Sequence, residues 1–175
     1  MAKIKTGVIG VGHLGSIHTR IYHELSDLCE FTGVYDANPE RAKEIAEQYN
    51  VKALDSLEDF FDNVDAASCA APTTKHFQVG MKAAERGCHL LMEKPITEKY
   101  EEGEKLVREF ENQKLVLMVG HTERFNPAME ICRHVDIKPK FIEGHRLAQF
   151  NPRGTDVAVI YDLMIHDIDI ILKFM

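Results

Sequence analysis

Three glycines near the start of the chain have the spacing of a dinucleotide-binding loop. An apolar run ends at Gly10, and Gly12 and Gly15 follow as a helical pattern begins. Gly10 allows a tight turn, Gly12 lets bare backbone approach a pyrophosphate, and Gly15 lets the helix pack close to the sheet. The motif alone is weak evidence. A second strand-like run, however, ends at Asp36, about 20 residues beyond Gly15, where a carboxylate can accept hydrogen bonds from ribose hydroxyls.

Two further loops carry candidate side chains at the ends of predicted strands. The first follows a strand predicted at 64–70 and contains Ala71, Pro72, Thr73 and His76. The second follows a strand predicted at 88–92 and contains Lys94. Ligands of open parallel sheets bind beyond the carboxyl ends of the strands, where an ammonium can stabilise a developing alkoxide. The alternatives are a plain connection for the first loop and an ordinary surface lysine for the second.

Three polar residues share one face of the last predicted helix. Asp162, His166 and Asp169 are spaced i, i+4 and i+7. In one interpretation Asp162 orients His166, which accepts a hydroxyl proton near neutral pH. In a second interpretation the three side chains bind a metal ion. In the third they form the solvated face of an amphipathic helix, and the spacing leaves all three open.

Other charged and titratable residues have less specific patterns. His13, His18 and His23 recur every five residues, which distributes them around a helix, so we interpret them as surface or packing side chains. Arg124 follows the last strand of the predicted sheet. Its guanidinium is expected either to meet an anionic substrate or to form a structural ion pair.

The composition is that of a folded domain. Of 175 residues, 45% are hydrophobic and 28% are charged, which is not typical of disorder. A net charge of -7 gives no support for nucleic acid or an anionic membrane as a partner. We find neither a signal-peptide pattern nor an apolar run long enough to span a bilayer, so we expect a cytoplasmic protein. Without a C-x-x-C pair, reduced thiols are expected at Cys29, Cys69, Cys88 and Cys132.

Strand-like and helical segments alternate over the first 120 residues. Strands are predicted at 3–10, 30–36, 64–70, 88–92 and 115–119, and helices at 13–25, 39–49, 74–86 and 98–112. Parallel neighbouring strands need crossovers of this length. Residues 1–120 are therefore predicted to form a doubly wound α/β domain, a Rossmann parallel sheet covered by helices on both faces.

The pattern changes after residue 120. It predicts a helix after Asn126, a strand from Lys140 to Gln149, a Pro/Gly loop at 151–154 and a helix from Asp156 to the end. One strand and two helices do not complete a sheet domain. We therefore expect 121–175 to be the start of an incomplete α+β domain, and the sequence to be the front half of a longer enzyme. Unpaired edges and apolar patches then favour a homo-oligomer, or poor order beyond about residue 125.

Four segments together resemble the Gfo/Idh/MocA oxidoreductases. They are GVIGVGHLGSIH (7–18), APTTKH (71–76), EKP (93–95) and DLMIHDID (162–169). The resemblance covers essentially the whole chain, and four motifs in the right order are far more specific than any one. It implies a nicotinamide cofactor and a sugar, polyol or nucleotide-sugar substrate, and it implies that 121–175 is the start of the domain for substrate binding and oligomerisation. The last motif, together with GHTERFNPA (120–128), looks most like members that act on UDP-N-acetylhexosamines at carbon 3.

The same resemblance implies roles for individual residues. Lys94 corresponds to the catalytic lysine of the family, and Asp162 and His166 correspond to its Asp-x-x-x-His pair. The implied substrate contacts are Lys94, Arg124 and His166. The implied cofactor contacts are Gly10, Gly12, His13, Leu14, Gly15, Asp36, Ala71, Pro72, Thr73, His76, Glu93 and Lys94.

These expectations combine into one reaction. A substrate hydride passes to the nicotinamide while His166, supported by Asp162, takes the hydroxyl proton and Lys94 stabilises the alkoxide; Lys94 and His166 can also exchange these roles. Asp36 favours NAD(H), because its carboxylate repels a 2'-phosphate, while the nearby Arg41 keeps NADP(H) as an alternative. Two competing readings are a nucleotide-sensing regulatory protein without catalysis and an inactive truncated fragment.

Overall fold

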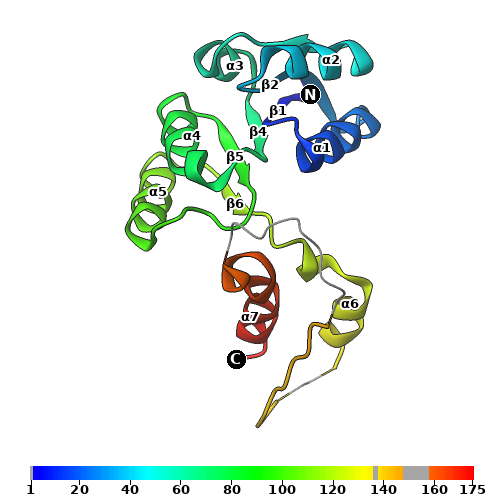
Figure 1. The fold of residues 1–175 in the computed structure, drawn as a ribbon, viewed down its shortest axis with the longest axis vertical. Coiled ribbons are helices and arrows are strands. Elements are labelled where there is room, and N and C mark those ends of the chain that lie inside the picture. The colour runs from blue at the N-terminus through cyan, green and yellow to red at the C-terminus, as the bar shows by residue number, and fades with distance from the viewer. Residues whose placement is uncertain (1, 136–137, 148–157) are drawn as a thin grey trace. The chain divides into compact units, whose positions relative to one another are not determined.

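The computed structural model describes residues 2–135, 138–147 and 158–175. The chain divides into two compact units, Met1–Gly120 and His121–Met175. Figure 1 shows the sheet and its helices in the first unit and mainly short helices in the second. In the described part of the chain, none of the helices combines the length and apolar character that crossing a membrane requires.

The first unit is built on six parallel strands in the order β3-β2-β1-β4-β5-β6. Their bounds are β1 Ile4–Ile9, β2 Cys29–Tyr35, β3 Lys52–Ala53, β4 Ala66–Cys69, β5 His89–Met92 and β6 Leu117–Val119. The order reverses between β1 and β4. At such a point the two neighbouring crossovers diverge and leave space for a ligand beyond the carboxyl ends of the strands.

Helices cover both faces of this sheet. α1 (His13–Glu24) and α2 (Pro39–Tyr49) contact each other and β2 on one face, and α4 (Thr73–Glu85) contacts both α3 (Leu57–Asn63) and α5 (Tyr100–Asn112) on the other. Each face has its own buried apolar cluster. Adjacent residues of β1 divide between the two clusters: Val8 joins the α1 side and Ile9 the side with Phe60. The doubly wound α/β fold predicted from the sequence is confirmed.

Two elements of this unit are absent from the sequence-based prediction. β3 is only two residues long and exposed, too short for any alternating pattern. α3 begins at the N-cap Ser56, whose side chain accepts a hydrogen bond from the Asp59 amide, and it buries Phe60 and Phe61. Its seven residues are too few to show a helical period, so only the cap signals it.

Burial keeps the two innermost cysteines as thiols. All four cysteines are free. Burial raises the pKa of Cys69 to about 11 and that of Cys88 to about 12, so neither forms a thiolate near neutral pH.

The second unit contains a 3-10 turn (Thr122–Phe125), α6 (Pro127–Arg133), a π turn (Ile160–Met164) and α7 (Ile165–Lys173). The predicted strand at Lys140–Gln149 is wrong over its described part, since residues 140–147 have no strand conformation. A strand needs a neighbouring strand for its backbone hydrogen bonds, and the described residues of this unit contain none. Residues 148–149, the loop at 151–154 and the cap at Asp156 lie outside the described residues.

Candidate active site

The glycine loop is tightly packed at two positions and open at the third. Gly10 has φ +79°, and a Cβ there would lie 2.6 Å from the backbone nitrogen of Ala71. A Cβ on Gly15 would lie 1.7 Å from the carbonyl oxygen of Gly10. Around Gly12, in contrast, a Cβ would meet nothing within 4 Å. The loop thus leaves open the backbone at Gly12, where α1 begins with no side-chain cap at its N-terminus, and such a helix end is suited to a phosphate.

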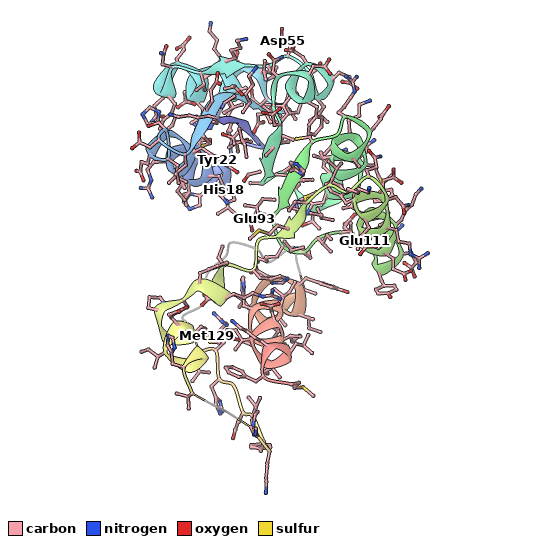
Figure 2. All side chains as sticks on the ribbon, turned by 180° about the vertical axis from the view of Figure 1, so that it is seen from behind. His18, Tyr22, Asp55, Glu93, Glu111 and Met129 are labelled. Carbon is pink, nitrogen blue, oxygen red and sulfur yellow. The ribbon has the colours of Figure 1, made fainter. Side chains whose placement is uncertain are left out.

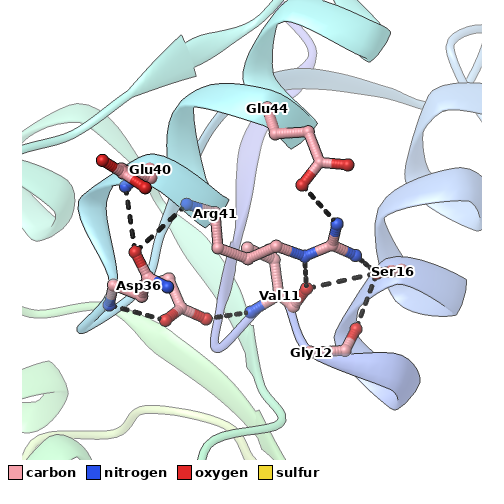
Figure 3. A network of polar contacts seen from close by, with 8 residues as sticks. Val11, Gly12, Ser16, Asp36, Glu40, Arg41 and Glu44 are labelled. Atoms are coloured by element: carbon pink, nitrogen blue, oxygen red, sulfur yellow. Dashed lines mark hydrogen bonds and ion pairs between the residues drawn. The ribbon is translucent and has the colours of Figure 1, made fainter.

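Asp36 is fixed against the same loop (Figure 3). It directly follows β2; its Oδ2 accepts a hydrogen bond from the Val11 amide at 2.8 Å, and its Oδ1 accepts one from the Asn38 amide at 2.8 Å. The carboxylate therefore lies beside the start of the glycine loop, at the carboxyl edge of the sheet. Fixed acceptor oxygens at this place suit the hydroxyls of a ribose.

Arg41, on α2, is engaged by three oxygens of its surroundings (Figure 3). Its Nε donates to the Val11 carbonyl at 3.0 Å, Nη2 donates to the Ser16 hydroxyl at 2.9 Å, and Nη1 donates to Glu44 at 2.7 Å. The guanidinium thus joins α2 to the glycine loop and to α1. These contacts give Arg41 a structural role whichever cofactor is bound.

The loop after β4 packs directly on the glycine loop. Ala71 carries the backbone that excludes a Cβ at Gly10. Pro72 precedes α4, and Thr73 is the first residue of that helix. His76, one turn later, is 1% exposed, and its two ring nitrogens lie within hydrogen-bond distance of backbone carbonyls. Its ring is therefore buried beneath the loops and does not lie at their surface.

Glu93, directly after β5, is held by an unexpected partner, His18 (Figure 2). The Nε2 atom of His18 lies 3.2 Å from Oε1 of Glu93, and the two side chains are 12% and 9% exposed. Oε2 of Glu93 accepts a hydrogen bond from the Lys94 amide at 3.3 Å. Gly120 leaves room for this carboxylate, because a Cβ there would lie 2.7 Å from Oε1. The Glu93 carboxylate thus connects α1 to the backbone of Lys94.

The histidine spacing in α1 predicts surface or packing positions, and both occur. His13 and His23 are exposed, whereas His18 packs against Glu93. The five-residue spacing shows that the three side chains point in different directions. It does not show which of them meets a carboxylate from a strand about 70 residues further along the chain.

The second unit pairs Arg124 with Asp169. Nε of Arg124 donates to Oδ2 of Asp169 at 2.7 Å, and Nη2 donates to Oδ1. Asp169 is 8% exposed, and the guanidinium holds the pKa of its carboxyl below the ordinary value. His121 lies nearby, its Nδ1 3.8 Å from Oδ1 of Asp169. Of the two roles expected for Arg124, the structural ion pair is present.

The predicted helix around His166 begins with a wider turn. Residues Ile160–Met164 form a π turn, which leads into α7 at Ile165. Asp162 and His166 are both half-buried, while Asp169 is buried. The three residues thus share the less exposed side of this segment, although the π turn changes the angle between Asp162 and the rest.

The geometry does not favour a metal site at these three residues. Asp169 directs both carboxylate oxygens to Arg124. Across the described parts of the chain, no three His, Cys, Asp or Glu side chains are grouped so that they could hold a metal ion.

The structure brings the predicted site residues together in two separate groups. The first unit unites the glycine loop, Asp36, the loop after β4, and Glu93 with Lys94 at one edge of the sheet. The second unit carries Arg124, Asp162 and His166. The catalytic role of Lys94, Asp162 and His166 therefore stays a prediction.

The Arg124–Asp169 pair predicts a pH dependence of stability. Because the folded-state pKa of Asp169 is lowered, the pair stabilises the fold above the ordinary carboxyl pKa of about 4, and the contribution disappears as pH falls through the lower, folded value. Replacing Asp169 by Asn should cost about 1 kcal/mol near pH 7, since Arg124 is half exposed and screened by solvent.

Urea unfolding followed by circular dichroism at a series of pH values measures this difference. The two proteins should converge in stability as the solution becomes more acidic than about pH 4. An equal difference at every pH would show that the charge of Asp169 contributes nothing.

The strand order, the open glycine loop and the carboxylate after β2 define a dinucleotide-binding Rossmann domain. Residues 4–121 match the family model of the Gfo/Idh/MocA proteins, described as an oxidoreductase family with an NAD-binding Rossmann fold. The chain belongs to this family.

Known relatives extend the comparison beyond the first unit. The chain is 43% identical over 173 residues to UDP-N-acetylglucosamine 3-dehydrogenase of Acidithiobacillus ferrooxidans, covering 98% of the chain and 54% of that protein. It is 28% identical over 182 residues to scyllo-inositol 2-dehydrogenase (NAD(+)) of Bacillus subtilis, covering 96% of the chain and 53% of the relative.

A comparison with solved structures also finds a similar protein over the whole chain. The structure of UDP-N-acetylglucosamine 3-dehydrogenase GnnA from Acidithiobacillus ferrooxidans matches with a TM-score of 0.93 and 41% identity, over 100% of this chain and 57% of that one. The chain thus spans about half the length of the relatives that it matches.

Proposed function

We propose that this chain belongs to an NAD-dependent dehydrogenase that oxidises a secondary alcohol of a nucleotide sugar, and that its first unit binds the cofactor. The observation that carries the proposal is the open space at Gly12 beside the fixed carboxylate of Asp36, in a family that binds NAD. Identity to a UDP-N-acetylglucosamine dehydrogenase over nearly the whole chain favours a nucleotide sugar over a free sugar or polyol.

The residues of the first unit fit a dinucleotide. The backbone at Gly12 and the uncapped N-terminus of α1 would receive the pyrophosphate, with His13 and Leu14 in the same turn. Asp36 would accept hydrogen bonds from the adenosine ribose. The loop after β4 and the Glu93–Lys94 segment would border the other half of the molecule. NAD supplies a hydride acceptor when bound.

Three side chains would act on the substrate. His166 would take the proton of the reacting hydroxyl, with Asp162 one helical turn away to orient its ring. The Lys94 ammonium would stabilise the negative charge that develops on the same oxygen. Arg124, whose side chain is 49% exposed while it pairs with Asp169, would meet an anionic group of the substrate.

Cofactor binding and substrate oxidation are tested separately. Titration of this chain with NAD should show saturable binding, and absence of binding would overturn the proposal. The substrate is identified by offering UDP-sugars, free sugars and polyols to a catalytically active form of the protein. Oxidation of each compound is monitored by the absorbance of the nicotinamide. Turnover of free polyols but not of nucleotide sugars would correct the substrate class.

Asp36 also predicts a preference between the two nicotinamide cofactors. NAD(H) should bind at least about tenfold more tightly than NADP(H), because the carboxylate pairs with a free 2'-hydroxyl and repels a 2'-phosphate. Replacing Asp36 by Asn keeps an acceptor for the Val11 amide but removes the charge, so the two affinities should approach each other.

Titrations of both cofactors with both proteins measure this effect. Replacing Glu47 by Gln removes the same charge from an exposed position on α2 and should leave the preference unchanged. Tighter binding of NADP(H) by the unmodified chain would contradict the prediction.

A further inference from the structure

His76 connects two loops at the carboxyl edge of the sheet. Its Nε2 lies 2.9 Å from the carbonyl oxygen of Ala71, in the loop after β4. Its Nδ1 lies 2.8 Å from the carbonyl oxygen of Pro95, in the loop after β5 and next to Lys94. His76 is 1% exposed, so bulk solvent does not reach either contact.

The contacts continue from Ala71 to the glycine loop. The backbone of Ala71 lies so close to Gly10 that a Cβ on the glycine would be 2.6 Å from the Ala71 nitrogen. Gly10 in turn meets Gly15, at the start of α1. A displacement of Pro95 would therefore be transmitted through the His76 ring and Ala71 to the loop proposed to bind the pyrophosphate.

The hydrogen-bond chemistry of the ring limits how it makes these two contacts. A carbonyl oxygen only accepts, and a neutral imidazole carries a single N–H. Both contacts are hydrogen bonds only when both ring nitrogens carry a proton. In a neutral ring one nitrogen lone pair would face a carbonyl oxygen at under 3 Å.

We propose that His76 is a positioning residue whose buried ring, held between the carbonyls of Ala71 and Pro95, clamps the loop of Lys94 to the cofactor loop. In this role it acts through backbone carbonyls and makes no contact with the cofactor. The clamp rests on the proposed function, because its purpose is to fix Lys94 relative to a bound dinucleotide.

Replacing His76 by Asn tests the clamp on this chain without cofactor. The Asn amide is too short to reach both carbonyls, so backbone amides of Ala71, Thr73, Lys94 and Ile96 should exchange with solvent about tenfold faster or more. The matched control is Val79→Ala, a buried residue of the same helix that belongs to the apolar cluster. This control should lower the stability of the first unit without a specific increase of amide exchange in these two loops.

Equal acceleration of loop exchange in the two variants would overturn the clamp. If the Asn variant does not fold, an NMR measurement on the unmodified chain still tests the clamp. Nuclear Overhauser effects in the NMR spectrum of the unmodified chain should connect the ring protons of His76 both to Ala71 and to the loop that contains Pro95. A ring that contacts only one of the two loops in solution would overturn the proposal.

These measurements are independent of turnover. Two results together would support the clamp and overturn the proposed function: faster amide exchange confined to the two loops in the His76 variant, and full turnover after replacement of Lys94. Unchanged amide exchange in the His76 variant, together with a large loss of turnover in the Lys94 variant, would support the proposed function and overturn the clamp.

Discussion

Replacing Lys94 by Ala, or His166 by Asn, should lower turnover by about a hundredfold or more in a form of the protein that turns over. Each substitution removes a group proposed to act mainly in the transition state, so NAD affinity should change little. Steady-state kinetics with the oxidised cofactor, alongside NAD titration, measures both quantities. The effect should appear in kcat and not only in KM.

Two substitutions of the same chemical kind serve as controls. Lys99→Ala removes an exposed lysine close to Lys94, and His134→Asn removes an exposed histidine of the second unit. Both should leave turnover unchanged. Near-normal turnover in the Lys94 or His166 variant would return that residue to a structural role. Loss of activity on chelation, restored by a divalent ion, would instead support metal binding.

Replacing Gly15 by Ala should destabilise the first unit by about 3 kcal/mol or more. The new Cβ would lie 1.7 Å from the Gly10 carbonyl oxygen, which is backbone and cannot turn aside as a flexible side chain would. Relief requires α1 to move away from the sheet. Urea unfolding of both proteins measures the loss, and a variant of unchanged stability would show that α1 shifts without cost.

Replacing Gly12 by Ala in the same loop separates an effect on NAD affinity from an effect on the stability of the fold. A Cβ at Gly12 meets no atom within 4 Å, and its φ of -64° suits alanine, so stability should stay close to that of the unmodified chain. The methyl group would, however, occupy the space proposed for the pyrophosphate. NAD affinity should fall about tenfold or more. Undiminished affinity would place the pyrophosphate elsewhere.

The fold was predictable where the chain repeats a long pattern. β1 and β2 are six and seven residues long and end in apolar residues that are mostly buried, and the crossovers between strands show clear helical periods. β3 and α3 lack the length for such a pattern. The strand predicted from Lys140 failed for a different reason, since alternation shows that a segment can form a strand but not that a neighbouring strand exists to pair with it.

The site was predictable where the chemistry lies in a local motif. The three glycines and Asp36 fall at one sheet edge because the motif itself specifies a strand, a turn and a helix. The partners of Glu93 and His76 were not predictable. His18 meets Glu93 across 75 positions of sequence, and His76 meets the carbonyl of Pro95, which is a backbone group that any residue type would supply.

The place of β1 in the middle of the sheet has a consequence for synthesis on the ribosome. The first strand to emerge pairs with β2 on one side and with β4 on the other, where Gly7 lies opposite Ala67. Its second edge therefore stays unpaired until about 60 further residues have been made, which takes several seconds at ordinary elongation rates of about 5–20 residues per second. During this time Ile9, which is buried in the finished fold, lacks most of its cluster, because the other buried members of that cluster run from Leu54 to Phe110. Until β4 is made, this edge of β1, the strand that leads into the glycine loop, is thus open to pairing with other chains.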